Sequence, residues 1–580
     1  MIKLSQEQAE IVNAPLAPMS VVACAGSGKT KTAVSRLAKI RKELGSCRER
    51  VALLSFSNIA VKTFRSDYSK YVQEREHCGS YEKVTIETLD GFITSNILRP
   101  HAYRTMGCSN TPFLLSGTES FLQNAKFKFE RLKEDGTKIP VQAKEIANIT
   151  YRKINGKSDF YCNSRNNLYK IVNGLKVTNE LGKIGAYSHE LGKFWACKTL
   201  VEQKNILKVL ASRYPHIIID EAQDIDYLHQ VFLEMLAKAG VKITLIGDPS
   251  QAIYDFAGAD GSFLKEFHTN DEYISKELTK NFRSIPNILN IANTLSKRDD
   301  KADRKQVNEQ YGAFYAVYEP SKTNHLLDIF QKAVENSGQN ISEAVVLSRS
   351  NSIVNRIKGT GSKIGQGKTA LLAQAAICRD QNSDFLRAFK LVTNCVVGLL
   401  VNPPDNLAVM ISNPDFNSDY KELKRDIWKF VRSEKTGLPS ALLNAREEWH
   451  GLLKKRMNIL LRLIENKYSF EPQKDLGRKL NCKDLPASQL VRDPELLDVK
   501  VRVRVDTVHQ AKGESLDSVL YVATKEHIKA MLEGVDSELG RIGYVAVTRA
   551  RNLFVLGVPK NSVIELKEGL HSIGLKELKK

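Results

Sequence analysis

The chain contains 580 residues and carries a formal net charge of +20. It is too long for one hydrophobic core, so several domains are expected, and an apolar content of 42% excludes a wholly disordered chain. The excess of positive charge favours a polyanionic partner, and nucleic acid is the usual partner of this kind.

Two further features of the composition exclude other classes of protein. The longest apolar stretch, residues 392–401, is far shorter than the ~18 residues that span a bilayer, and the polar start MIKLSQEQAE has no signal core. The nine cysteines are scattered without a CxxC pair or a Cys/His cluster, which argues against a zinc or iron–sulfur site. These features predict a cytoplasmic protein that does not contact a membrane.

The first predicted element is a buried strand over residues 19–25, which leads into the glycine-rich loop ACAGSGKT. A helix is expected after the loop, because apolar residues recur at helical spacing over residues 32–44. Such a loop presents backbone N–H groups to phosphate oxygens. We therefore expect Lys29 to contact the β- and γ-phosphates of a nucleotide and the Thr30 hydroxyl to bind Mg²⁺.

A basic segment comes next. Residues 96–210 contain 19 Lys and Arg but 9 Asp and Glu, so half of the excess positive charge lies in about a fifth of the chain. Aromatic side chains such as Phe127, Tyr151 and Phe160 are interspersed with the basic ones. This mixture predicts a surface for phosphates and bases rather than a disordered tail.

Polar side chains follow two later predicted strands. A buried run over residues 216–220 ends in Asp220 and Glu221, and the next strand, over residues 241–247, leads to Gln251. Ligands bind at the carboxyl edge of a parallel sheet. We expect Asp220 to hold Mg²⁺ through water, Glu221 to polarise the attacking water and Gln251 to sense the γ-phosphate. The alternative is a pair of ordinary exposed carboxylates at a strand end.

The second half predicts another parallel sheet and a helical insertion. Apolar β-branched runs stand at residues 343–350, 501–510, 518–524 and 553–558, and helical patterns at 426–437 and 447–467. A second GKT lies in GSKIGQGKTALL, residues 361–372, but no buried strand leads into it. It is expected to be a loop in which Lys368 lies on the surface or faces DNA.

Nine short stretches carry a more specific signal through their order along the chain. They are LSQEQ (4–8), ACAGSGKT (23–30), LLSFSNIAVKTFR (53–65), TLDGF (88–92), DEAQD (220–224), GDPSQAIYDFAGA (247–259), LTKNFRS (278–284), VDTVHQAKGESLD (505–517) and RIGYVAVTRAR (541–551). Together they resemble the motifs of superfamily 1A helicases of the UvrD/Rep/PcrA type, in sequence and in order.

The resemblance implies an α/β fold of two RecA-like parallel-sheet domains with mostly helical insertions. The expected boundaries are 1–93 and 205–285 for domain 1A, 94–204 for the inserted basic domain 1B, 286–354 and 495–580 for domain 2A, and 355–494 for a reduced inserted domain 2B.

The resemblance also implies ATP and Mg²⁺ in a cleft between the two lobes, where Gln8 reads adenine, Phe282 stacks on it and Arg549 reaches the γ-phosphate. The implied catalytic residues are Lys29, Asp220, Glu221, Gln251, Arg283 and Arg549, with Thr30 and Asp220 as metal ligands. The implied ATP-binding residues are Gln8, Ala23, Cys24, Ala25, Gly26, Ser27, Gly28, Lys29, Thr30, Lys31, Phe282, Arg283, Glu514 and Arg549. The implied DNA-binding residues are Phe56, Asn58, Thr88, Tyr254, Phe256 and His509.

The implied function is that of a DNA-dependent ATPase and helicase that moves 3′→5′ on single-stranded or tailed duplex DNA. A second hypothesis is a DNA-sensing ATPase switch in an anti-phage defence complex, which controls a partner nuclease or ATPase subunit. A third is an RNA-directed motor, because composition does not separate DNA from RNA.

Several positions depart from the family pattern. Asp90 stands where the family has histidine, Phe256 replaces tryptophan, and Ala257 replaces arginine. In the stretch KGES-x-D the carboxylate of Glu514 is shifted by one position, which is similar to a branch found in defence systems of the Gabija type.

Overall fold

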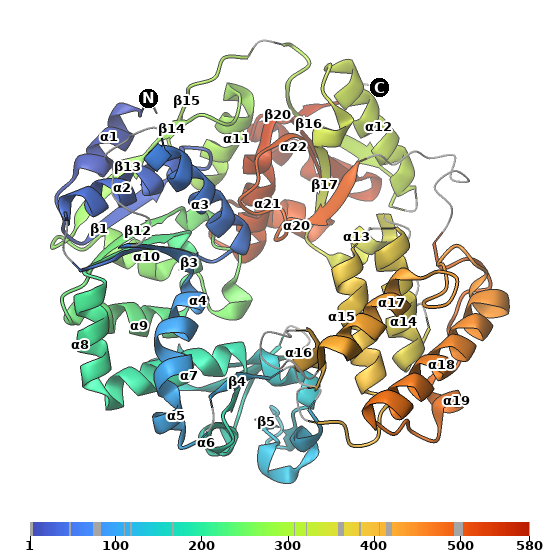
Figure 1. The fold of residues 1–580 in the computed structure, drawn as a ribbon. Coiled ribbons are helices and arrows are strands. Elements are labelled where there is room, and N and C mark those ends of the chain that lie inside the picture. The colour runs from blue at the N-terminus through green and yellow to red at the C-terminus, as the bar shows by residue number, and fades with distance from the viewer. Residues whose placement is uncertain are drawn as a thin grey trace. The chain divides into compact units, whose positions relative to one another are not determined.

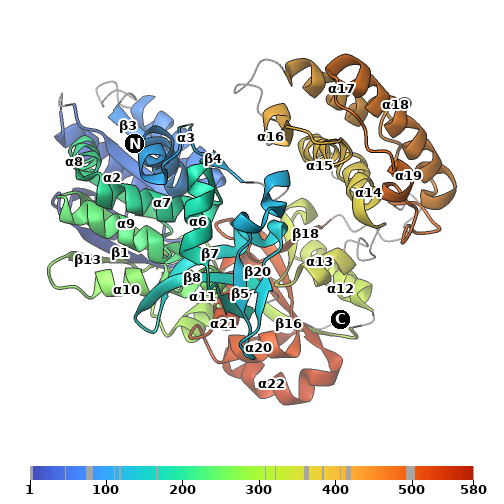
Figure 2. The same cartoon turned by 90° about the horizontal axis from the view of Figure 1, so that it is seen from below.

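The computed structural model describes residues 4–45, 48–73, 83–109, 111–115, 119–164, 167–306, 308–320, 322–357, 365–381, 384–404, 407–412, 420–491 and 503–578 (Figure 1 and Figure 2). The chain divides into two compact units. The larger comprises residues 1–118, 122–354 and 502–580, and the smaller comprises residues 119–121 and 355–501. The finer division into four domains stays a prediction.

The first sheet of the larger unit has six strands in the order β13-β1-β12-β11-β2-β3. The strands are β1 (Met19–Ala23), β2 (Val51–Ser55), β3 (Val84–Thr88), β11 (His216–Asp220), β12 (Lys242–Gly247) and β13 (Ile274–Leu278). All neighbours run parallel, so their carboxyl ends share one edge. Strands β1, β2 and β11 are buried at every residue, which explains their continuous apolar sequences.

Helices pack against this sheet through apolar faces. They are α1 (Gln6–Asn13), α2 (Lys29–Glu43), α3 (Asn58–Gln73), α9 (Tyr227–Lys238) and α10 (Ser262–His268). The predicted helix after the glycine-rich loop is α2, and its Val34 and Leu37 join Val21 of β1 in the core. The loop that connects β1 to α2 is therefore fixed at both ends by buried elements.

The segment between β3 and β11 contains helices and small sheets. The helices are α4 (Leu89–Ile93), the π-helical turn η2 (Thr94–Leu98), α5 (Arg99–Met106), α6 (Gly174–Lys183), α7 (His189–Glu202) and α8 (Lys204–Arg213). The strands are β4 (Phe113–Leu114), β5 (Glu130–Leu132), β6 (Lys138–Pro140), β7 (Ile149–Ile154), β8 (Lys157–Ser164), β9 (Asn167–Lys170) and β10 (Ala186–Tyr187). The prediction of a mostly helical insertion did not include the antiparallel pair β5-β6 and the three-stranded antiparallel sheet β7-β8-β9.

The second sheet of the larger unit is also parallel, in the order β18-β17-β19-β20-β16-β21. Its strands are β16 (Gly312–Tyr318), β17 (Ala344–Ser348), β18 (Arg504–Thr507), β19 (Leu516–Val522), β20 (Ala550–Pro559) and β21 (Lys576–Glu577). Its helices are α11 (Pro286–Ser296), α12 (Thr323–Asn336), α13 (Asn351–Ile357), α20 (Lys525–Leu532), α21 (Glu538–Arg549) and α22 (Val563–Ser572). The two parallel sheets confirm the predicted α/β class with two RecA-like sheets.

The smaller unit is helical in its described residues. Its helices are α14 (Gly367–Asp380), α15 (Phe385–Val397), α16 (Leu407–Ser412), α17 (Lys421–Arg432), α18 (His450–Tyr468) and α19 (Leu476–Lys479). The apolar stripe predicted over residues 447–467 is confirmed, because Leu453, Met457 and Ile464 of α18 are fully buried. None of the helices in the described ranges has both the length and the apolar character that a membrane crossing requires.

The prediction of a loop at the second GKT stretch is wrong, because these residues begin a helix. Lys368 and Thr369 lie in the first turn of α14, whereas residues 361–364 lie outside the described ranges. The Thr369 side chain is fully buried and its hydroxyl donates to the carbonyl of Asn481 at 2.7 Å. This hydroxyl therefore serves the packing of the helical unit and is not offered to a metal ion.

Candidate functional site

The glycine-rich loop after β1 has a backbone that only glycine accommodates at two positions. Gly26 and Gly28 have φ angles of 76° and 81°. A Cβ on Gly26 would lie 2.5 Å from the Cβ of Arg283, and one on Gly28 would lie 2.6 Å from the Nε2 of Gln8. Glycine is therefore required both by the backbone conformation and by the close approach of neighbouring elements.

Neighbouring side chains and backbone amides hold the carbonyl groups of this loop. The amide of Phe282 donates to the carbonyl of Gly26 at 2.9 Å, and the side chain of Asn281 donates to the carbonyl of Ala25 at 2.6 Å. Gln8 donates from Nε2 to the carbonyl of Ser27 at 2.9 Å. The loop is thus fixed before any ligand arrives.

A pocket of about 360 Å³ opens at this loop. Its lining combines residues from both parallel-sheet lobes of the larger unit. The lining residues are Ala25, Gly26, Gly28, Lys29, Thr30, Asp220, Glu221, Gln251, Phe282, Arg283, Gly513, Ser515, Arg549 and Arg551. The structure therefore brings together all six residues predicted to be catalytic, along with Phe282.

The charges in the pocket suit a polyanion with a bound cation. Lys29, Arg283 and Arg549 are cationic, and burial together with Arg549 lowers the pKa of Arg283 to about 9. Burial and the neighbouring Glu221 raise the pKa of Asp220 to about 8. The Asp220 Oδ1 is buried without a hydrogen-bond partner among the described residues. A buried carboxylate oxygen that lacks a hydrogen-bond partner fits a Mg²⁺ ion, which Asp220 and Thr30 would hold.

Glu221 has the character of a general base. Burial alone would raise its pKa, but Lys29 and Lys512 lower it below its ordinary value. The side-chain amide of Gln223 donates to Glu221 Oε2 at 2.6 Å and orients the carboxylate. The residue has a φ of 55°, in the left-handed region where a non-glycine residue is uncommon. An ionised, oriented carboxylate beside Lys29 can accept a proton from an attacking water.

Arg549 links the second lobe to the first at the pocket. It ends α21 and is only 1% exposed. Its Nη2 donates to Gln251 Oε1 at 2.8 Å, and its Nη1 donates to the carbonyl of Glu514 at 3.2 Å. Gln251 in turn donates from Nε2 to Asp248 at 2.7 Å. Gln251 of the first lobe and Arg549 of the second lobe are therefore in direct contact at the pocket.

A buried ion pair makes a second link between the lobes. Lys512 Nζ lies 2.6 and 2.7 Å from the two carboxylate oxygens of Asp224, which belongs to the DEAQD stretch. Lys512 also lies 4.8 Å from the ring centroid of Tyr254. The segments after β11, after β12 and after β18 thus meet at one place.

Two residues predicted to bind ATP have other roles in the structure. Gln8 is 2% exposed, and its side-chain amide accepts from the Ser5 amide at 3.0 Å and donates to the carbonyl of Ser27, so it braces the loop; its contact with adenine stays a prediction. The carboxylate of Glu514 pairs with Arg504 at 2.7 and 2.8 Å, and only its backbone carbonyl serves the site. Of the remaining loop positions, Ala23, Cys24, Ser27 and Lys31 do not line the pocket.

Sequence reasoning missed three residues that line the pocket. They are Gly513, Ser515 and Arg551. The first two flank the shifted Glu514, and the third lies two positions after Arg549, so each stands beside a predicted residue. Proximity to the motifs was the signal that could have found them.

The residues predicted to bind DNA fall into two groups. Tyr254, Phe256 and His509 form a ring cluster with centroid distances of 5.9, 5.6 and 6.2 Å, and Phe256 is 51% exposed. The second group stands at the ends of β2 and β3, where Asn58 is exposed and Phe56 is half-buried. The Thr88 hydroxyl accepts from the Gly91 amide at 3.0 Å and caps α4.

The departure at Asp90 is matched by a histidine from another element. Asp90 Oδ1 lies 3.0 Å from His229 Nε2, and His229 Nδ1 lies 3.2 Å from Asp226. Lys193 of α7 pairs with Asp226 and lies 2.8 Å from Glu190. Burial lowers the pKa of a histidine, but Asp226 and Asp90 outweigh burial and Lys193 and raise the pKa of His229 to about 9. The raised pKa favours an imidazolium that joins α9 to Asp90 of α4, while Asp226 links His229 to Lys193 of α7.

We expect the stability contribution of His229 to depend on pH. Because its pKa is raised from 6.5 to about 9, the contribution is fully present below pH 6.5 and is lost as the pH rises through about 9. The shift corresponds to at most ~3 kcal/mol. Replacement by His229→Gln should lower the Tm at neutral pH, and the Tm gap to the unmodified chain should narrow between about pH 6.5 and about pH 9. The exposed His325→Gln is the control, and a gap that stays constant with pH would contradict the assignment.

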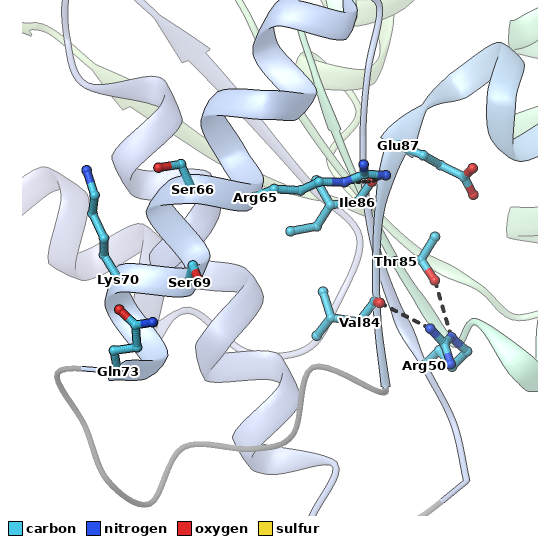
Figure 3. A pocket seen from close by; sticks show the side chains of 10 residues that line it. All are labelled: Arg50, Arg65, Ser66, Ser69, Lys70, Gln73, Val84, Thr85, Ile86 and Glu87. Atoms are coloured by element: carbon cyan, nitrogen blue, oxygen red, sulfur yellow. Dashed lines mark hydrogen bonds between the residues drawn. The ribbon is translucent and has the colours of Figure 1, made fainter.

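A second pocket in the larger unit, of about 790 Å³, lies between α3 and β3 (Figure 3). None of the predicted site residues lines it. Arg65 donates from Nε and Nη2 to the carbonyl of Ile86 at 3.0 and 2.7 Å, and Arg50 donates to the carbonyl of Val84 at 3.1 Å. These arginines occupy carbonyl groups of the edge strand β3, which protects that edge from pairing with another strand.

Comparisons with known proteins bear on this arrangement. Residues 4–272 match the model of the UvrD/REP helicase N-terminal domain. The chain is similar to the ATP-dependent DNA helicase PcrA of Staphylococcus epidermidis, with 21% identity over 626 residues, covering 95% of this chain and 83% of the relative. It is similar to the ATP-dependent DNA helicase PcrA of Staphylococcus aureus, with 21% identity over 632 residues and the same coverage.

Proposed function

We propose that this chain, which is UvrD/PcrA-like, is an ATP-dependent DNA helicase or translocase of superfamily 1A that moves 3′→5′ on single-stranded DNA. Its enzymatic class would be that of a DNA-dependent ATPase. The substrate would be single-stranded DNA or a duplex with a single-stranded tail, and ATP with Mg²⁺ would be the energy source.

One observation carries the proposal. A single pocket collects Lys29, Asp220, Glu221 and Gln251 from the first lobe and Arg549 from the second. A phosphate loop, a metal-binding carboxylate, a base and an arginine supplied from another lobe are the parts that ATP hydrolysis needs. Because Arg549 contacts Gln251 directly, occupation of the pocket would be transmitted to the relative position of the lobes.

The protein groups have separate roles in this proposal. Lys29 would neutralise charge on the β- and γ-phosphates, while Glu221 would take the proton of the attacking water. Arg549 would stabilise charge that develops on the transferred phosphoryl group. Mg²⁺, when bound, would supply Lewis-acid stabilisation of the phosphate oxygens. Phe282 would stack on the adenine ring.

Strand displacement tests the proposed direction. A duplex with a 3′ single-stranded tail should be unwound in an ATP-dependent way, whereas the same duplex with a 5′ tail should not. Because phosphate contacts release counterions, the affinity for oligothymidylate should fall steeply as salt is added, with a logarithmic slope of roughly −0.7 per contacted phosphate. Equal unwinding of both tailed duplexes would refute the direction.

A second proposal keeps the ATPase but not the unwinding. The chain would act as a DNA-sensing switch in an anti-phage complex and control a partner nuclease. The KGES-x-D stretch with its shifted Glu514 supports it, because this stretch is similar to the branch found in defence systems. ATP hydrolysis triggered by DNA ends without any strand displacement, together with a nuclease subunit that co-purifies from the native host, would favour this switch.

A further inference from the structure

The loop that presents Phe256 is held by hydrogen bonds and an ion pair from two sides, although Phe256 itself is exposed. This segment, residues 252–258, is called the Phe256 loop. It contains the short helical turn Asp255–Ala257 and is closed by hydrogen bonds from the amides of Ala257 and Ala259 to the carbonyl of Tyr254, at 2.8 and 3.2 Å. Phe256 is the one residue of this loop that is exposed, at 51%.

The second lobe holds one side of the Phe256 loop. Arg541 of α21 donates to the carbonyl of Ala252 and forms an ion pair with Asp255. His509 contacts the carbonyl of Ile253 at 3.0 Å.

The antiparallel sheet of the basic segment holds the other side. Arg152 of β7 donates from Nη2 to the carbonyl of Phe256 at 2.8 Å and from Nε to the Thr150 hydroxyl at 2.8 Å. Asn163 of β8 donates from its side-chain amide to the same carbonyl at 3.1 Å. Two donors from paired strands therefore converge on one acceptor, which is the backbone carbonyl of the residue whose ring is exposed.

We propose that Arg152 and Asn163 are positioning residues that hold the Phe256 ring as a rigid platform for a DNA base. The proposal rests on the proposed function and assigns the basic segment a defined task in it. The fork of Arg152 joins Thr150 to the loop, so the ring is fixed before DNA arrives and less conformational freedom is lost on binding. A stacked base tolerates any sequence, as a translocating protein requires.

The rival explanation is that Arg152 contacts a DNA phosphate directly. The two differ in what a variant changes. A positioning residue acts only through the ring. Its substitution should therefore leave the salt dependence of DNA binding unchanged, and it should not weaken binding further in a variant that already lacks the Phe256 ring. A phosphate contact lowers the salt slope by about one contact and is independent of the ring.

The test measures binding of fluorescein-labelled oligothymidylate by the full chain, by five variants with one substitution and by two variants with two substitutions. Phe256→Ala should weaken binding about tenfold. Arg152→Ala and Asn163→Ala should each weaken it about three- to tenfold with an unchanged salt slope, and Arg152→Gln, which keeps a donor without the charge, should restore most of the loss. In the Phe256→Ala background, Arg152→Ala should add less than about twofold. Lys153→Ala, on the same strand, is the control and should combine additively with Phe256→Ala.

The outcomes separate the two levels of the account. The positioning role is overturned if Arg152→Ala costs the same factor with and without the Phe256 ring, or if Arg152→Ala and Asn163→Ala both leave binding and the DNA-stimulated ATPase unchanged. It is also overturned if Phe256→Ala has no effect, although DNA-stimulated hydrolysis would still support the proposed function. If the unmodified chain binds no oligothymidylate, the proposed function itself fails. An unchanged Tm in the variants shows that the fold is intact.

Discussion

Lys29→Ala should lower the kcat for ATP hydrolysis by at least about 10²–10³-fold, which is the range for loss of one preorganised group that stabilises developing charge. Lys29 lines the pocket at the start of α2, beside Asp220 and Glu221. Its ammonium also lowers the pKa of Glu221, so the substitution removes a phosphate contact and weakens the ionisation of the proposed base. The measurement is steady-state ATP hydrolysis with saturating oligothymidylate.

One control is a second lysine on the same helix, and the other is the DNA affinity of the Lys29→Ala variant itself. Lys39→Ala removes a lysine from α2 that pairs with Glu43 at 3.0 Å on the surface, and it should leave hydrolysis unchanged. The affinity of Lys29→Ala for oligothymidylate should stay within about threefold of the unmodified chain, because the pocket and the ring cluster are built from different side chains. Hydrolysis by Lys29→Ala at the normal rate would remove the basis for the whole assignment.

Arg549→Lys should lower the kcat by about 10³-fold, at the lower end of what an arginine supplied to a transferring phosphoryl group contributes. Lysine keeps the charge but loses the planar fork that joins Gln251 to the carbonyl of Glu514. The affinity for ATP should change far less than the kcat, because the arginine acts on charge that develops in the reaction. Single-turnover hydrolysis and equilibrium ATP binding measure the two separately.

A second variant tests whether Arg549 and Gln251 act as one unit. Gln251→Ala alone should slow hydrolysis, but in the Arg549→Lys background it should add little, since residues that act together are strongly non-additive. If the two substitutions lower the kcat by independent factors that multiply in the double variant, the contact between Gln251 and Arg549 does not contribute to catalysis. Equal loss of ATP affinity and kcat in Arg549→Lys would place the arginine in ground-state binding instead.

The parallel sheets and the pocket follow from local patterns in the sequence. Continuous apolar runs such as residues 216–220 can only be buried on both faces, and their ends carry Asp220 and Glu221. Because β12 pairs in parallel with both β1 and β11, these carboxylates lie at the same edge of the sheet as the loop after β1. Motif order supplied Arg283 and Arg549, which no local rule brings to the pocket.

Two features were readable in the sequence and were missed. Ser5 and Gln8 have the spacing of a capping box, and in the structure Gln8 completes this capping box at the start of α1. Asn155-Gly156 separates two alternating runs, and both residues have positive φ, as a two-residue hairpin turn requires. That turn creates the β7-β8 pair that an expectation of helices omitted.

The remaining features depend on contacts between distant segments. Arg152 reaches the Phe256 carbonyl across 104 positions, and His229 reaches Asp90 across 139. Neither pair lies in one element, and no periodicity or spacing links them. The diversion of Glu514 to Arg504 is similar, because it depends on the course of the chain after β18.

The most direct test of the account is the rate of ATP hydrolysis by the purified chain with and without oligothymidylate, at two salt concentrations. We expect slow hydrolysis without DNA, strong stimulation by oligothymidylate at low salt, loss of that stimulation as salt rises, and none of this activity in Lys29→Ala. Hydrolysis at the same rate with and without DNA, or an unchanged rate in Lys29→Ala, would contradict it.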